Sequence, residues 1–88
     1  HARRVDGNQA AIVSAMRAAG ASVELLFAVG HGCPDIIVCY RSILYFMEIK
    51  ALLQSRLTAA EKRWHETWKG PVYIVTSIDE ALKAIGAM

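Results

Sequence analysis

The sequence has few cysteines, few prolines and no apolar stretch of membrane-spanning length. Its two cysteines, Cys33 and Cys39, cannot form a disulfide scaffold, and we interpret Cys39, which lies in an apolar run, as a small buried hydrophobe. His31, Cys33 and Cys39 are scattered candidates for zinc ligands. The sequence has no Cys-x-x-Cys pair, which argues against a structural zinc site. We see no signal peptide and no spanning segment, and therefore expect a cytoplasmic protein without a membrane partner.

An excess of charge of one sign is also missing. Ten Lys and Arg stand against eight Asp and Glu, which gives a net charge of +2 over 88 residues. The hydrophobic fraction of 55% argues against disorder, and the length predicts a single domain over residues 1–88. So apolar a composition on so small a body leaves apolar surface uncovered, and a homodimer is the commonest way to cover it.

Hydrophobic periodicity and turn residues predict the order α-β-β-β-α-β-α, an α/β fold with a mixed four-stranded sheet flanked by helices. The expected helices cover residues 8–19, 58–69 and a short segment from 77, and the expected strands cover 22–29, 35–40, 43–50 and 72–77. Asp6 or Asn8 is expected to cap the first helix, whose inward stripe would hold Ile12, Met16 and Ala19 with Val13 beside it.

Two capping boxes mark the starts of the second and third helices, and one short connection predicts a hairpin. Thr58 with Glu61, and Ser77 with Glu80, have the spacing of reciprocal helix caps, and Leu82 and Ile85 should face inward from the last helix. Only residues 41–42 separate the second and third strands, which is hairpin spacing. Arg-Ser is not favoured in two-residue primed turns, so a longer turn remains open.

The hairpin places three charged residues together. If Tyr40 pairs with Ile43, Asp35 lies opposite Glu48 with β-carbons roughly 4.5–5.5 Å apart, and Lys50 points to the same face. Two carboxylates in this position repel each other unless a hard cation binds both, and an adjacent ammonium could help to activate a water. The alternative is that Asp35 is a loop carboxylate and the other two are solvated on an exposed strand face.

The apolar residues around these charges make both strands of the hairpin almost continuously hydrophobic. Such runs are expected of strands that are buried on both faces. Charged groups at the ends of buried strands are costly and therefore call for a functional explanation. Without the two acids assigned to metal, ten cations face six acids, a balance that can hold phosphates.

The series Gly32-Cys33-Pro34-Asp35, an apolar strand and Glu48-Ile49-Lys50 resembles the G-x-P-D…E-x-K signature of the PD-(D/E)XK nucleases, and within them the VRR-Nuc domains. Segments 6–9, 57–58 and 77–82 extend the resemblance. It implies a restriction-endonuclease-like fold in which Asp35, Glu48 and the backbone carbonyl of Ile49 bind Mg²⁺ or Mn²⁺, while Lys50 orients the attacking water. It also implies that standalone members are dimers that cut branched DNA, as Holliday-junction resolvases do.

One departure concerns the first helix, where many relatives carry a Glu near the metal. Here that region offers Asp6, Asn8 and Gln9, with no Glu before Glu24. Asn8 or Gln9 could support the site as polar groups behind the metal ligands. His31, in the loop before Asp35, is a further candidate for this supporting role.

Basic residues near the second helix are candidates for phosphate contact. These are Arg56, Lys62 and Arg63, with Arg3 and Arg4 at the amino terminus as further candidates. Trp64 and Trp68 either stack on exposed bases or pack against the sheet or a partner subunit, and packing is the preferred interpretation.

The sequence thus predicts a metal-dependent endodeoxyribonuclease, selective for branched DNA, that uses no small-molecule cofactor. Two alternatives stay open. One is a catalytically silent DNA-binding or scaffold module with the same fold, and the other is an α/β interaction module that dimerises through its apolar surface.

Overall fold

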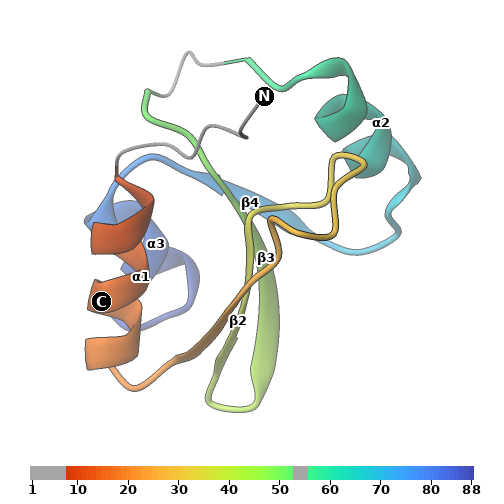
Figure 1. Ribbon diagram of the computed structural model, residues 1–88. Coiled ribbons are helices and arrows are strands. Elements are labelled where there is room, and N and C mark those ends of the chain that lie inside the picture. The colour runs from red at the N-terminus through yellow and green to blue at the C-terminus, as the bar shows by residue number, and fades with distance from the viewer. Residues whose placement is uncertain (1–7, 53–55) are drawn as a thin grey trace.

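Four strands form one mixed sheet in the order β1-β2-β3-β4, and three helices lie against it (Figure 1). The computed structural model describes residues 8–52 and 56–88. The elements are α1 (Gln9–Ala18), β1 (Ser22–Leu25), β2 (Ile36–Tyr40), β3 (Ile43–Ile49), α2 (Ala59–Thr67), β4 (Val72–Val75) and α3 (Ile78–Ala84). The predicted element order and fold class are confirmed. Within the described residues, no helix is long and apolar enough to cross a membrane.

The sheet changes direction at its last strand. β2 pairs antiparallel with both β1 and β3, whereas β4 lies parallel to β3. Parallel neighbours need a crossover connection, and α2 lies within the segment that supplies it. The amino end of α2 therefore comes near the carboxyl end of β3, where the charged residues of the hairpin lie.

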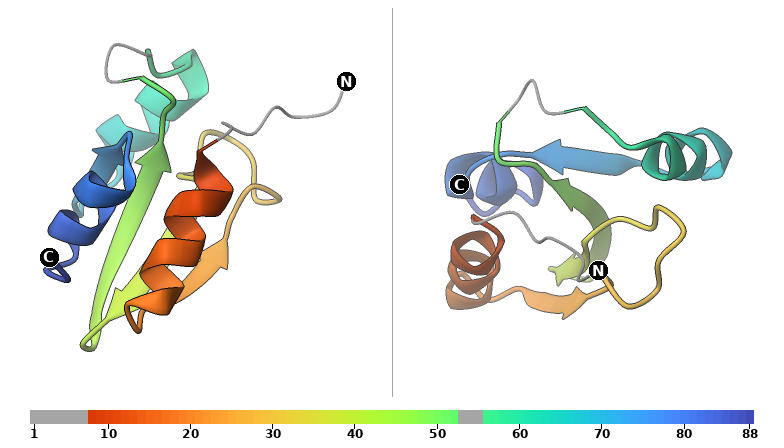
Figure 2. Two further views of the ribbon diagram at one scale, coloured as in Figure 1. Left: turned by 90° about the vertical axis from the view of Figure 1, so that its left-hand side faces the viewer. Right: turned by 45° about the horizontal axis from the view of Figure 1, so that its top comes forward.

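The hydrophobic core lies between one face of the sheet and the helices α1 and α3, which lie side by side on that face (Figure 2). Its largest members are fully buried: Ile12, Met16, Ile36, Val38, Met47 and Ile49. Ile85 of the α3 end is also buried, and Leu82 packs against this cluster. Ala19 was expected on the buried stripe of α1 but is exposed, because it is the C-cap residue that follows the last helical turn.

The opposite face of the sheet is only partly covered. α2 lies at one end of it, where the Phe46 ring meets Trp64 and Trp68 at centroid distances of 5.6 and 5.0 Å. The preferred interpretation of the two tryptophans, packing against the sheet, is confirmed. Leu44 and Ile74 remain 64% and 44% exposed. The expectation that both hairpin strands are buried on both faces was therefore wrong, because a short helix at one end cannot cover the whole face.

Several local predictions also need correction. β1 ends at Leu25, and a turn, not a strand, occupies residues 27–29. Arg41 and Ser42 form a two-residue hairpin turn with φ of 51° and 69°, so the longer turn does not occur. Both angles are positive, as a type I′ turn requires, even though neither residue favours that region. Cys39 is only partly buried, since it lies on the partly covered face, whereas Cys33 is buried.

The helix starts differ in how they are capped. At α2 the reciprocal Thr58–Glu61 box is complete, as predicted. At α3 the Ser77 hydroxyl accepts from the Glu80 amide, but the Glu80 carboxylate accepts from the amide and hydroxyl of Thr76 instead of closing the box. Asn8 precedes α1 without a side-chain cap bond, and the alternative cap, residue 6, lies outside the described residues.

Candidate active site

The hairpin register brings the predicted acids together. Tyr40 pairs with Ile43, and the pairing continues in step to Ile36 opposite Met47. The next step of the same ladder places Asp35 across from Glu48, so the predicted register is confirmed. Asp35 Oδ2 accepts a hydrogen bond of 2.7 Å from the backbone amide of Ile49, which fixes this carboxylate beside the end of β3.

A tight loop before β2 positions Asp35 next to the end of β3. Gly30, His31 and Gly32 are consecutive residues in the left-handed region, with φ of 73°, 57° and 80°. A β-carbon at Gly32 would overlap the backbone oxygen of Ala60, so only glycine lets the loop approach the first turn of α2. The Asp35 carbonyl then accepts from the Leu26 amide at 2.8 Å, which closes the loop.

Glu48 is the most unusual group of the site. Its side chain points to the partly covered face, yet the residue is only 1% exposed, and its Oε1 is buried with no hydrogen-bond partner. Burial raises the pKa of Glu48 to about 9, helped by the hydrogen bond and negative charge of Asp35 and by the charge of Glu61, against the opposing effect of Lys50. With no cation bound, Glu48 therefore keeps its proton at neutral pH.

Lys50 lies between two carboxylates. Its Nζ is 2.9 Å from Glu61 Oε1 and 3.9 Å from Glu48 Oε2. Burial alone would raise the pKa of Glu61, but hydrogen bonds from Lys50 and from the Thr58 amide outweigh it, and the pKa is lowered. The sequence identified Glu61 as a helix cap and missed its place in this site, because no local pattern reveals which residue the start of α2 will face.

The three predicted supporting residues lie in different places. Asn8 Nδ2 donates to the carbonyls of Lys50 and Thr76, at 3.2 and 2.8 Å, and so ties the start of α1 to the carboxyl ends of β3 and β4. Asn8 thus contacts the backbone next to the acids and not the carboxylates themselves. Gln9, which follows Asn8 in the sequence, is buried at the start of α1.

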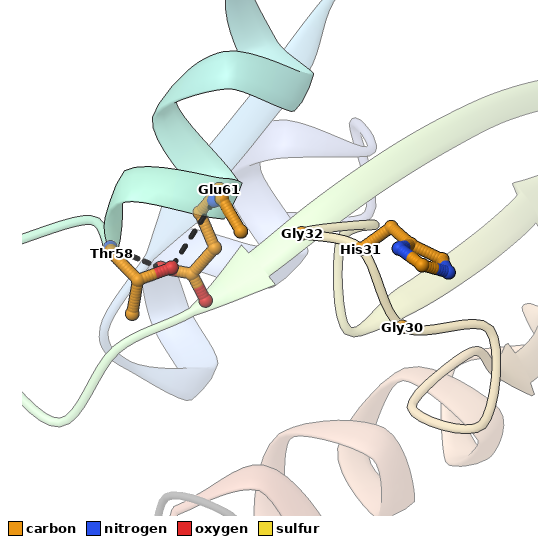
Figure 3. Close-up of a pocket in the computed structure, with 6 residues that line it drawn as sticks. Gly30, His31, Gly32, Thr58 and Glu61 are labelled. Atoms are coloured by element: carbon orange, nitrogen blue, oxygen red, sulfur yellow. Dashed lines mark hydrogen bonds between the residues drawn. The ribbon is translucent and has the colours of Figure 1, made fainter.

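His31 is exposed and lines a cavity of about 270 Å³ between its loop and the start of α2. Figure 3 shows this cavity, with Thr58 and Glu61 joined by their capping bonds on one side and the glycine loop on the other. Glu61 therefore takes part both in the wall of the cavity and in the ion pair with Lys50.

The predicted phosphate-binding residues lie at the same end of the molecule. Arg56 and Lys62, with Leu57, line a hollow of about 410 Å³, and Arg63 is exposed on α2. Arg3 and Arg4 lie outside the described residues. The start of α2 thus presents positive side chains next to a site whose own charges are mostly negative.

The side chains of the site that could bind a cation are carboxylates, which bind through oxygen atoms. Across residues 8–52 and 56–88, no three His, Cys, Asp or Glu side chains are grouped so that they could hold a metal ion. Asp35 and Glu48 supply two carboxylates, while Glu61 binds Lys50. Further ligands for a cation at this pair would have to come from backbone and water oxygens, which suits Mg²⁺ better than zinc.

Comparison with known proteins gives one informative result. No protein-family profile matches the sequence, and no curated protein matches it. A solved structure described as a VRR_NUC domain superposes with a TM-score of 0.72, at 25% sequence identity, over 89% of this chain and 89% of that chain. Together with the acidic hairpin that the motifs predicted, this likeness confirms the resemblance seen in the sequence: the chain folds as a VRR-Nuc domain.

Proposed function

We propose that the protein is a metal-dependent DNA endonuclease that hydrolyses phosphodiester bonds at Asp35, Glu48 and Lys50. The observation that carries this proposal is the unpartnered Oε1 of Glu48, buried beside a second carboxylate. Such an arrangement opposes folding, and a cation bound by both acids removes the conflict. The VRR-Nuc fold supports the nuclease class.

The residues present fit a hard divalent cation. Asp35 and Glu48, with the backbone carbonyl of Ile49, would hold Mg²⁺ or Mn²⁺ through oxygen atoms. When bound, the cation supplies charge stabilisation at the scissile phosphate and lowers the pKa of a water. Lys50, whose ammonium lies at the edge of the acid pair, orients the attacking water by donating a hydrogen bond to it.

The substrate is proposed to be DNA that is recognised by shape. Arg56, Lys62 and Arg63 would contact phosphates, which position a duplex without reading its bases. The partly covered sheet face, where Leu44 is 64% exposed, supports a homodimer in which a second copy covers it. A two-fold symmetric dimer with two sites would suit branched DNA such as a four-way junction.

The test is cleavage of linear, flapped and four-way DNA, with Mg²⁺, with Mn²⁺ and with a chelator. Asp35→Asn removes the charge but leaves an oxygen that can still accept from the Ile49 amide, so we expect a folded protein without cleavage. Asp79→Asn, on the exposed first turn of α3, is the matched control and should cut as the parent does. Undiminished cleavage by Asp35→Asn would refute the site.

A catalytically silent DNA-binding module is the second candidate. The first turn of α1 contains no acidic residue, and Asn8 is engaged by backbone carbonyls, so one acid that many relatives use is missing. This candidate predicts metal-independent binding of branched DNA and no cleavage with any divalent cation.

A further inference from the structure

Glu61 is held in place more firmly than a helix cap requires. It is the third residue of α2 and only 8% exposed. Its Oε1 accepts from the Thr58 amide at 2.8 Å, while its own amide donates to the Thr58 hydroxyl at 3.1 Å. These two bonds, drawn in Figure 3, leave the carboxylate little freedom to rotate.

The same oxygen also receives the ammonium of Lys50. Oε1 accepts from Lys50 Nζ at 2.9 Å, whereas the nearest oxygen of Glu48 lies 3.9 Å from that ammonium. Lys50 therefore makes a short, charge-assisted hydrogen bond to the cap of α2, and its ammonium lies farther from Glu48.

We propose that Glu61 is a positioning residue that holds the Lys50 ammonium away from the Asp35–Glu48 pair and thereby keeps Glu48 available to a divalent cation. This inference rests on the proposed function. Glu48 Oε2, which lies 3.9 Å from the ammonium, is the oxygen of the acid pair that Lys50 would approach if Glu61 no longer held it. An ammonium bound there competes with the cation for the same carboxylate.

The loop before Asp35 packs against the start of α2, the helix that contains Glu61. Gly32 packs against the backbone of Ala60 at the start of α2, and the loop that contains Gly32 leads directly into Asp35. The loop thus sets the position of the acid pair and that of the α2 cap together.

Glu61→Gln separates positioning from capping. Glutamine at this place in a capping box still accepts from the Thr58 amide, but it lacks the negative charge that holds the ammonium. Glu80→Gln is the matched control, because Glu80 caps the start of α3 through Thr76. Both variants should unfold at temperatures similar to that of the parent, as measured by circular dichroism.

The readout is Mn²⁺ binding to the protein without DNA, measured by the electron paramagnetic resonance signal of the free ion. We expect Glu61→Gln to weaken binding about tenfold when Lys50 is present and less than about twofold in a Lys50→Met background, a coupling typical of contacting residues. Glu80→Gln should leave Mn²⁺ binding unchanged.

Three results would overturn the inference. Equal weakening in both backgrounds would show that Glu61 acts on the ion directly and not through Lys50. Binding by Glu61→Gln equal to that of the parent would show that the residue is a helix cap alone. If the parent itself binds no Mn²⁺, the proposed function fails and the inference fails with it, whereas either of the first two results leaves the nuclease proposal intact.

Discussion

Glu48 should make the metal-free protein less stable as the pH rises. Its pKa is raised from 4.5 to about 9 in the folded chain, so the folded state keeps a proton that the unfolded state releases. The contribution of Glu48 to stability is therefore fully present below pH 4.5 and is lost as the pH rises towards 9, by about 1.4 kcal/mol for each pH unit. The lowered pKa of Glu61 has the opposite sign, and its contribution to stability is lost only at acid pH.

Glu48→Gln removes this titration and keeps the shape of the side chain. We would measure the free energy of unfolding in urea, with a chelator, at about pH 5.5 and about pH 7.5. The advantage of the variant over the parent should grow by about 3 kcal/mol between these two values. Glu24→Gln, at an exposed position of β1, controls for the loss of a surface carboxylate.

Adding a divalent cation is the second arm of this experiment. The parent should gain about 2.7 kcal/mol at a cation concentration one hundred times the dissociation constant, because the ion binds the folded state alone. Glu48→Gln should gain much less. An advantage of the variant that is the same at both pH values would refute the assignment of a buried, protonated Glu48.

Three other perturbations have defined outcomes. Gly32→Ala should lower the free energy of unfolding in urea by about 3 kcal/mol or more, because its β-carbon would overlap Ala60. Gly20→Ala is the control: the space around it is open, so it should cost about 1 kcal/mol from backbone strain alone. Replacing Arg41-Ser42 by Asn-Gly should raise the melting temperature, with a gain of about 0.5–1 kcal/mol. Leu44→Glu should keep the fold but give a monomer in analytical ultracentrifugation if a second copy covers the sheet face, and unchanged sedimentation would argue against that dimer.

The hairpin could be predicted because its geometry is local. A two-residue connection fixes the pairing, and side chains alternate between the faces with a period of two. These rules place Asp35 across from Glu48 and Lys50 on their side without reference to the rest of the chain. The turn type was uncertain for an equally local reason, since Arg41 and Ser42 adopt left-handed angles that their side chains do not favour.

What surrounds the hairpin could not be predicted in this way. The exposure of Leu44 depends on how far α2 extends over the sheet, and a continuous apolar run has the same pattern whether one face or both are covered. In the same way, the spacing of Ser77 and Glu80 predicts a capping box, but the path of β4 gives the Glu80 carboxylate the amide of Thr76 instead.

The sequence alone therefore determined the order of the elements, the register of the hairpin and the face that carries the acids, because each follows from contacts between near neighbours in the chain. Only the tertiary structure decided that Glu61 binds Lys50, that Asn8 ties α1 to the ends of β3 and β4, and that one sheet face stays partly open. Those contacts depend on how helices dock after the loops close, and that docking is set by packing over the whole domain.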